Sequence, residues 1–137
     1  MASSDTLDVV LVAPDPALFA SLVMSLRAAN HRIWEMRDCA SALAFLLDND
    51  ADVVVVDSAL QGIKGLEIVP LLKKIRPVAR IITVVDENSL ANFRQVLDCG
   101  IFYHSFKPFD QDRILEAICG AHKHKSEDLT SKGSKNG

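Results

Sequence analysis

The sequence predicts an α/β fold in which one parallel sheet carries helices on both faces. Short apolar runs alternate with helix-like patterns five times along the chain. The central run, Val53–Val56, has no polar alternation, which is typical of a strand buried on both faces. A chain of 137 residues has the length of one such domain. The (βα)₅ pattern therefore predicts a single doubly wound parallel sheet.

The first part of the chain carries two strand–helix units. Asp15 suits an N-cap and Pro16 a first helical turn, and Asp38 suits the N-cap of the next helix. Apolar side chains then recur at the spacing that places them on one helix face. The expected elements are a strand at Val9–Ala13, a helix from Pro16 to about Ala29, a strand at His31–Met36 and a helix from Asp38 that carries Leu43, Leu46 and Leu47.

The third unit is built around the most apolar strand, Ala51–Asp57, whose only late polar residue is the last one. Gly62 and Gly65 interrupt the pattern and predict a loop. Pro70 either kinks the helix that follows or marks a later start for it. The apolar stripe of this helix consists of Leu66, Val69, Leu72 and Ile75, and Pro77 ends it.

Two further units complete the domain, which we expect to comprise residues 1–122. Gly100 has the place of a C′ residue, and Asp110 that of an N-cap. Residues 123–137 are rich in Lys, Ser and Gly, so we expect a disordered tail or the start of a linker. The expected elements are a strand at Arg80–Val85, a helix at Leu90–Asp98, a strand at Ile101–Phe106 and a helix at Asp110–His122.

Composition and charge restrict the classes of function. A net charge of −3 without a basic stripe gives no electrostatic case for binding nucleic acid or anionic membrane. No apolar run is long enough to cross a bilayer, and three scattered cysteines indicate reduced thiols, so we expect a cytoplasmic protein. No catalytic triad or P-loop is present, which favours a protein that is not an enzyme.

The cysteines have two possible roles. Cys39 and Cys99 are most simply small buried hydrophobic residues. Cys119, His122 and His124 could be read as a metal cluster, but they lack a fourth ligand and lie among lysines. A helix C-terminus that carries cations is the interpretation that we favour for this segment.

Asp57 and Lys107 are the strongest candidates for a functional site. Asp57 ends the third expected strand, and Lys107-Pro108 follows the fifth. Open α/β sheets bind ligands at the carboxyl ends of their strands, and these two side chains are expected at that edge. A lysine there can pair with an anion.

The segment from Asp57 to Gly65, together with Lys107-Pro108-Phe109, resembles the receiver domain of two-component response regulators. The resemblance covers roughly Asp8 to His122. It implies a flavodoxin-like strand order of 2-1-3-4-5. It also implies that Asp57 is a phospho-acceptor, that Lys107 pairs with the phosphate, and that the peptide bond before Pro108 is cis. Gly62 and Gly65 match the loop glycines of the family.

Several positions depart from the family pattern. Receiver domains hold a divalent metal with two acidic residues after the first strand, and these positions fall on Ala13 and Pro14. The switch Thr or Ser falls on Val85, and the small residue after it becomes Asp86. The other departures are His104 at the aromatic switch position, Gln61 in place of a proline, and Lys64 in place of an acidic or amide residue.

These departures predict that the Mg²⁺-dependent phosphorylation of Asp57 is weakened. A metal normally bridges phosphate and carboxylate oxygens, and of the usual acidic set only Asp57 remains. Asp86 adds repulsion, since two such charges about 4 Å apart repel by roughly 4 kcal/mol at an effective dielectric constant of about 20. The alternative is that Asp15, Asp86 and Glu87 rebuild a metal site with Asp57. Otherwise Asp15 caps the first helix, and residues 86–88 form a solvated loop that caps the fourth.

Two functions follow. In one, a histidine kinase or phosphotransfer protein phosphorylates Asp57. In the other, the chain is a pseudo-receiver that binds a constitutive partner, and Asp57 is only half of a salt bridge. The resemblance places partner binding or a homodimer on the face of the fourth helix, fifth strand and fifth helix. Phe93 there is expected mainly in the core, and His104 either tunes such an interface or faces solvent without a role.

Overall fold

The computed structural model describes residues 6–60 and 65–120. Five parallel strands form one sheet in the order β2-β1-β3-β4-β5. This confirms the doubly wound fold and the strand order that the resemblance implied. The strands are β1 (Asp8–Val12), β2 (Arg32–Met36), β3 (Val53–Asp57), β4 (Arg80–Val85) and β5 (Ile101–Phe106).

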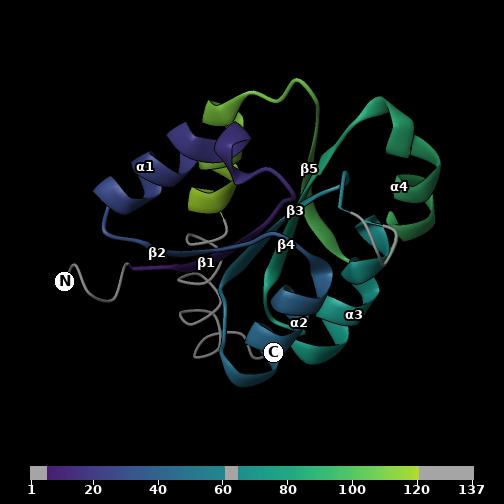
Figure 1. Ribbon diagram of the computed structural model, residues 1–137, viewed down its shortest axis with the longest axis horizontal. Coiled ribbons are helices and arrows are strands. Elements are labelled where there is room, and N and C mark those ends of the chain that lie inside the picture. Colours follow the sequence, from purple (N-terminus) through teal and green to yellow (C-terminus); the bar gives the residue numbers. More distant parts are fainter. Residues whose placement is uncertain (1–5, 61–64, 121–137) are drawn as a thin grey trace, which may run out of the picture.

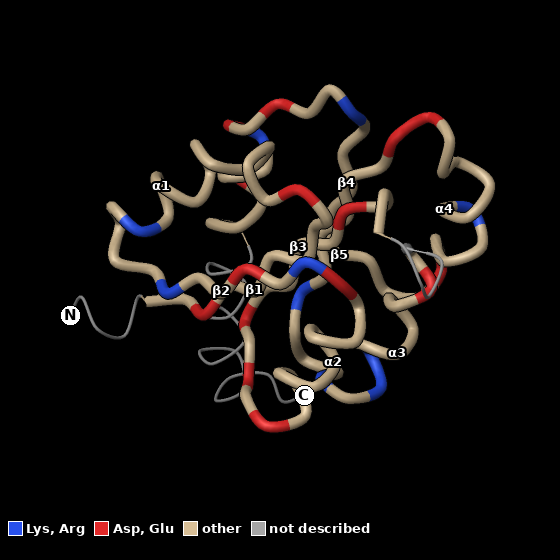
Figure 2. The backbone as a smooth tube through the Cα atoms, in the orientation of Figure 1, with Lys and Arg blue, Asp and Glu red and all other residues tan. Residues whose placement is uncertain are grey.

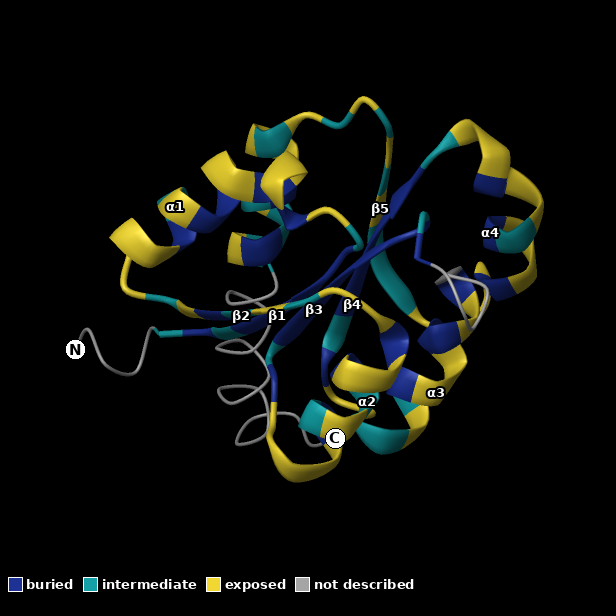
Figure 3. Ribbon diagram, in the orientation of Figure 1, coloured by how far each residue is buried: buried dark blue, intermediate teal, exposed yellow. Residues whose placement is uncertain are grey.

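The middle of the sheet is its most buried part. Every residue of β3 is buried, and so are the last five residues of β4. Figure 3 shows this as dark blue strands between yellow outer helix surfaces. Val54 pairs with Val10 of β1 on one side and with Ile81 of β4 on the other. A continuous valine run can occupy this place because both of its faces are covered.

Several helices begin with a 3₁₀ turn. Pro70 lies in the first turn of α3, where a missing N–H breaks no intrahelical hydrogen bond, so the later start is correct. Residues 111–120 form the C-terminal helix. The others are η2 (Pro16–Phe19), α1 (Ala20–Ala28), α2 (Cys39–Asp48), η3 (Gly65–Glu67), α3 (Ile68–Ile75), η4 (Glu87–Ser89) and α4 (Leu90–Val96).

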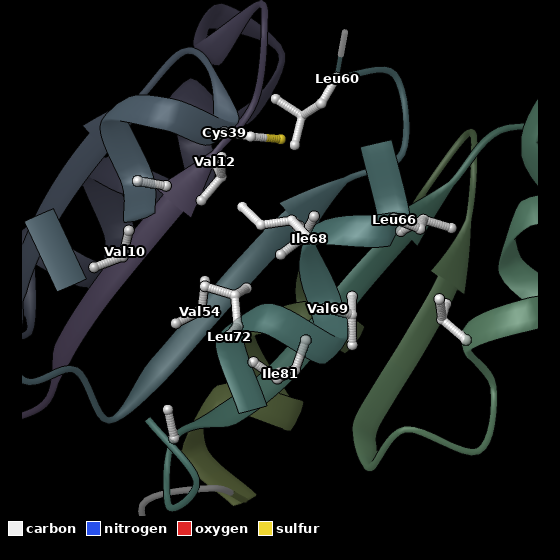
Figure 4. Close-up of a cluster of buried hydrophobic side chains, with 14 of the residues drawn as sticks. Val10, Val12, Cys39, Val54, Leu60, Leu66, Ile68, Val69, Leu72 and Ile81 are labelled. Atoms are coloured by element: carbon white, nitrogen blue, oxygen red, sulfur yellow. The ribbon is translucent and has the colours of Figure 1, made fainter. Parts of the chain in front are cut away.

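The helices cover the two faces of the sheet unequally. In Figure 1, α1 and the yellow-green C-terminal helix lie on one face, and α2, α3 and α4 lie on the other. Each face has its own apolar core. Ile114 and Ile118 pack with α1 on the first face. On the second face Ile68 and Leu72 of α3 lie over Val54, as Figure 4 shows.

The predicted caps had different outcomes. Asp38 Oδ1 accepts a hydrogen bond from the Ser41 N–H at 2.7 Å, and Asp110 Oδ1 accepts one from the Asp112 N–H at 2.9 Å. Gly100 has φ +90°, as expected of a C′ residue. Asp15 has the predicted N-cap position, but not the expected side-chain bond. Asp15 precedes a 3₁₀ turn, and its side chain accepts no capping hydrogen bond.

The remaining predictions concern cysteines and the chain ends. Cys39 is buried, Cys99 is half-buried against the core, and none of the three cysteines forms a disulfide. Within residues 6–60 and 65–120, no helix is long and apolar enough to span a membrane. The tail 123–137, the two histidines of the Cys119 cluster, and residues Gln61, Gly62 and Lys64 lie outside the described residues.

Candidate functional site

Asp57 is a buried carboxylate at the carboxyl edge of the sheet. It ends β3, and only 1% of its side chain is exposed. Asp57 Oδ1 lies 2.7 Å from Lys107 Nζ and accepts a hydrogen bond from the Ala59 N–H at 2.9 Å. Asp57 Oδ2 is also buried and accepts no hydrogen bond from the described residues. One oxygen is therefore held by a cation and an amide, while the other has no hydrogen-bond donor in the part of the chain that the structure describes.

Lys107 reaches this carboxylate from the opposite side of β4. Its backbone N–H donates to the Val85 carbonyl at 2.8 Å, which ties the end of β5 to the end of β4. The Lys107–Pro108 peptide bond is cis, as the resemblance implied. Lys107 Nζ also lies 4.0 Å from Asp86 Oδ2, so one ammonium group faces two carboxylates. Figure 2 shows the acidic turn between β4 and α4 at this edge.

Two serines hold Asp86 in place. The Asp86 N–H donates to Ser58 Oγ at 3.0 Å, and Ser89 Oγ donates to Asp86 Oδ1 at 2.9 Å. Ser58 and Ser89 are both buried, whereas the Asp86 side chain is 27% exposed. Asp86 thus caps the turn through a serine hydroxyl instead of a backbone amide. The expectation of a simple solvated loop here was incomplete, since one end of the loop is fixed against the acceptor strand.

Two of the positions that departed from the family pattern, Ala13 and Val85, have side chains that cannot bind a metal ion or a phosphoryl oxygen. Ala13 is fully buried, and its N–H donates to the Met36 carbonyl at 2.9 Å. Val85 is also fully buried, and its side chain has no hydroxyl. Among the described residues, no group of three or more His, Cys, Asp or Glu is placed to hold a metal ion. Within this part of the chain, Asp15, Asp57 and Asp86 are therefore not assembled as one metal-binding group.

His104 lies in an aromatic cluster on the face formed by α4 and β5. Its ring centroid is 4.9 Å from that of Phe93 and 5.4 Å from that of Phe106. Phe93 is buried, which confirms its role in the core, whereas His104 is exposed and Phe106 is 47% exposed. A pocket of about 330 Å³ beside them is lined by Val85, Glu87, Leu90, Phe106 and Lys107. The candidate face is therefore apolar next to the acceptor site.

Sequence reasoning missed three hydroxyl residues near this site. Ser58 and Ser89 organise the turn after β4, and Thr83 is fully buried with no hydrogen-bond partner for its Oγ1 within the described part of the chain. Thr83 pairs with His104 in the sheet register. Serines near loops are too common in sequences to indicate a role, so only the position of Ser58 directly after Asp57 could have pointed to it.

The family assignment comes from comparison with known proteins. The model of the response regulator receiver domain matches residues 9–119. The chain belongs to this receiver domain family. It is therefore a module of two-component signalling. Members of the receiver domain family are generally not enzymes. They typically use Mg²⁺ for phosphorylation, and they interact with histidine kinases or phosphotransfer proteins.

Individual relatives agree with this assignment. The receiver domain is 27% identical over 110 residues to the DNA-binding transcriptional regulator NtrC of Azospirillum brasilense, covering 80% of this chain and 23% of that protein. It is 31% identical over 98 residues to the sensory transduction protein LytT of Bacillus anthracis, covering 69% of this chain and 38% of that protein. The chain thus spans well under half the length of these two relatives.

Solved structures support the fold. A CheY-like receiver domain protein from Methanospirillum hungatei aligns with a TM-score of 0.82 at 21% identity, over 90% of this chain and 98% of that one. A response regulator from Burkholderia pseudomallei, solved with a phosphorylated aspartic acid, a calcium ion and citrate, aligns with a TM-score of 0.72 at 20% identity. That alignment covers 90% of this chain and 74% of the other.

Proposed function

We propose that Asp57 is the phospho-acceptor of this receiver domain and that its phosphorylation is weak. The observation that carries the proposal is the contact of 2.7 Å between Asp57 Oδ1 and Lys107 Nζ at the carboxyl edge of the sheet. A cation at this distance offsets the charge of a carboxylate and of a phosphoryl group bound to it. The phosphorylated aspartic acid in the Burkholderia pseudomallei relative agrees with such a role.

The reaction is a transfer of one phosphoryl group to the Asp57 carboxylate. A carboxylate oxygen attacks phosphorus and forms a new P–O bond. The bond from phosphorus to the donor breaks, and its electron pair leaves with the donor, an imidazole nitrogen of phosphohistidine or an oxygen of acetate. Asp57 Oδ2 can make this attack, since no donor within residues 6–60 and 65–120 occupies its lone pairs. Lys107 lies beside the carboxylate to balance the added charge.

Three features of the site weaken the reaction. The carboxylate is almost fully buried, so a donor must displace neighbouring atoms to reach it. Asp86 adds a second negative charge on the same lysine. Ala13 and Pro14 have no side-chain oxygen to recruit the Mg²⁺ that the family typically uses. Each feature raises the free energy of bringing a phosphoryl anion to Asp57.

A second candidate function is a phosphorylation-independent interaction module. The observation that favours it is the buried Val85 side chain, which has no hydroxyl to bind a phosphoryl group on Asp57. In this pseudo-receiver, Asp57 and Lys107 form a permanent ion pair. The partner is then a constitutive one, and it binds the apolar face that includes Phe106.

Intact mass after incubation with acetyl phosphate separates the two functions. Wild type and Asp57→Asn are compared with and without Mg²⁺. Phosphorylation predicts a slow gain of one phosphoryl group in the wild type alone. A gain that needs Mg²⁺ indicates a replacement acidic site, and Asp15, Asp86 and Glu87 are then substituted. The absence of any adduct, with no Mg²⁺ binding by titration, supports the interaction module.

The partner face is tested with a matched pair of surface variants. We propose that a kinase, a phosphotransfer protein or a second copy docks on α4, β5 and the C-terminal helix, where Phe106 is 47% exposed. Phe106→Ser should weaken self-association in analytical ultracentrifugation. Met24→Ser, on α1 at 70% exposed, should leave it unchanged. Equal effects of both variants, or none, would remove this face as the dimer interface.

A further inference from the structure

The acceptor carboxylate and the start of α4 are joined by an unbroken chain of polar contacts. Asp57 Oδ1 lies 2.7 Å from Lys107 Nζ, and the same ammonium lies 4.0 Å from Asp86 Oδ2. Asp86 Oδ1 in turn accepts a hydrogen bond from Ser89 Oγ at 2.9 Å. Ser89 is the N-cap residue of α4. Four side chains therefore connect the end of β3 to the first turn of α4.

We propose that the charge on Asp57 is relayed to the start of α4 through Lys107, Asp86 and Ser89. Lys107 is shared between two carboxylates, and it lies nearer to Asp57. A loss of charge on Asp57 lets the ammonium move toward Asp86 and tightens the turn. An added phosphoryl charge on Asp57 draws the ammonium away from Asp86 and loosens the turn. Only the effect of an added phosphoryl group rests on the proposed phosphorylation of Asp57.

The surroundings make Asp86 a relay and not a freely moving surface charge. Its backbone N–H is held by Ser58 Oγ at 3.0 Å, and Ser58 directly follows Asp57 on the chain. Ser89 Oγ lies 3.4 Å from the Ser58 carbonyl. Asp86 at the start of the turn and Ser89 at its end therefore both contact Ser58. Because Asp86 is held at its backbone N–H and at Oδ1, a change in the attraction between its carboxylate and the cation moves the turn. Val85, by contrast, can carry no such signal, because its side chain is apolar.

Amide hydrogen exchange measured by NMR at residues 87–90 tests the relay without phosphorylation. Asp57→Asn keeps the shape of the side chain and removes its charge. We expect it to slow exchange at these amides roughly two- to tenfold. In an Asp86→Asn background the same substitution should change nothing, because the second carboxylate no longer attracts Lys107. An unchanged exchange rate in Asp57→Asn alone would overturn the relay.

Two further backgrounds separate the relay from general electrostatics. Ser89→Ala removes the last contact of the chain and leaves all charges in place, so the response to Asp57→Asn should be lost. Glu87→Gln removes one neighbouring negative charge that belongs to no link of the chain, so the response should persist. If Glu87→Gln abolishes the response as Asp86→Asn does, the effect is long-range charge and the relay is wrong. Circular dichroism confirms that each variant is folded.

The phosphorylated protein gives an independent arm with the opposite sign. After acetyl phosphate treatment, wild type should show faster exchange at residues 87–90, and Asp86→Asn should show no change. If no adduct forms, the proposed phosphorylation fails, while the Asp57→Asn comparison still decides the relay. If an adduct forms and exchange slows, the direction of the relay is wrong.

Discussion

Asp57 Oδ1 and Lys107 Nζ lie 2.7 Å apart, and this contact ties the central strand of the sheet to the connection that follows its edge strand. The carboxylate is buried, whereas the lysine is 21% exposed. The two residues are thus unequal partners. Removing the lysine leaves a buried charge without its cation, whereas removing the carboxylate charge leaves a lysine that can reach water.

This difference in burial between Asp57 and Lys107 predicts the stability of variants at the two positions. Lys107→Met should lower the free energy of unfolding by about 3 kcal/mol, since an uncompensated carboxylate stays in the core. Asp57→Asn should cost clearly less, and the double variant should recover part of the loss of Lys107→Met. Urea unfolding at pH 7 measures all three. Equal losses for the two single variants would show that the burial of Asp57 does not govern the pair.

Thr83 is expected to be a destabilising residue in the core. Its Oγ1 is buried and has no hydrogen-bond partner among the described residues. Thr83→Val replaces the hydroxyl with a methyl group of similar shape, and it should raise the free energy of unfolding by about 1 kcal/mol. Thr83→Ser keeps the hydroxyl, loses a methyl group and should destabilise the protein. A destabilising Thr83→Val in urea unfolding would indicate that the hydroxyl has a partner in solution.

Asp38 predicts a stability term that depends on pH. The backbone hydrogen bond from Ser41 lowers the pKa of Asp38 below its ordinary value of 3.8. A lowered folded-state pKa stabilises the protein above that ordinary value, and the contribution disappears as pH falls through the folded-state pKa. The Tm of Asp38→Ala should therefore lie below that of wild type at pH 5–7, with the gap closing below about pH 3.8.

The control for this prediction is Asp38→Asn. Its side-chain oxygen still accepts the hydrogen bond from Ser41 but does not titrate. The gap between its Tm and that of Asp38→Ala should therefore persist at low pH. If both gaps close together, the acid sensitivity comes from groups other than the helix cap.

Gly100 is expected to tolerate no side chain. Its φ is +90°, and a Cβ added there would lie 3.3 Å from Lys73 Cε. Gly100→Ala should cost about 1–2 kcal/mol, from the left-handed backbone and the displaced lysine. Asn30, with φ 70°, is the matched position, and Asn30→Gly should be neutral or slightly stabilising in the same urea experiment. A neutral Gly100→Ala would contradict the assigned backbone geometry.

Much of the fold could be predicted because its signals are local. The valine run before Asp57 indicates a strand that is buried on both faces, whatever surrounds it. Proline and glycine act on the backbone at their own positions, so Pro70 and Gly100 could be interpreted from the sequence. The meeting of Asp57 with Lys107 also follows from the sequence, since parallel strands bring their carboxyl ends to one edge.

Other features depended on contacts that the sequence does not specify. Asp15 has a capping residue type, but the 3₁₀ turn after it leaves the side chain without a capping bond. Asp86 reads as a surface charge, yet Ser58 and Ser89 from two different loops hold it beside Lys107. The sequence by itself thus determined the parallel sheet and the common edge of Asp57 and Lys107, because strand periodicity sets both, while the strand order came from the family resemblance. Only the tertiary structure decided the partners of Asp86 and left Thr83 Oγ1 without one among the described residues, because both depend on how separate segments pack.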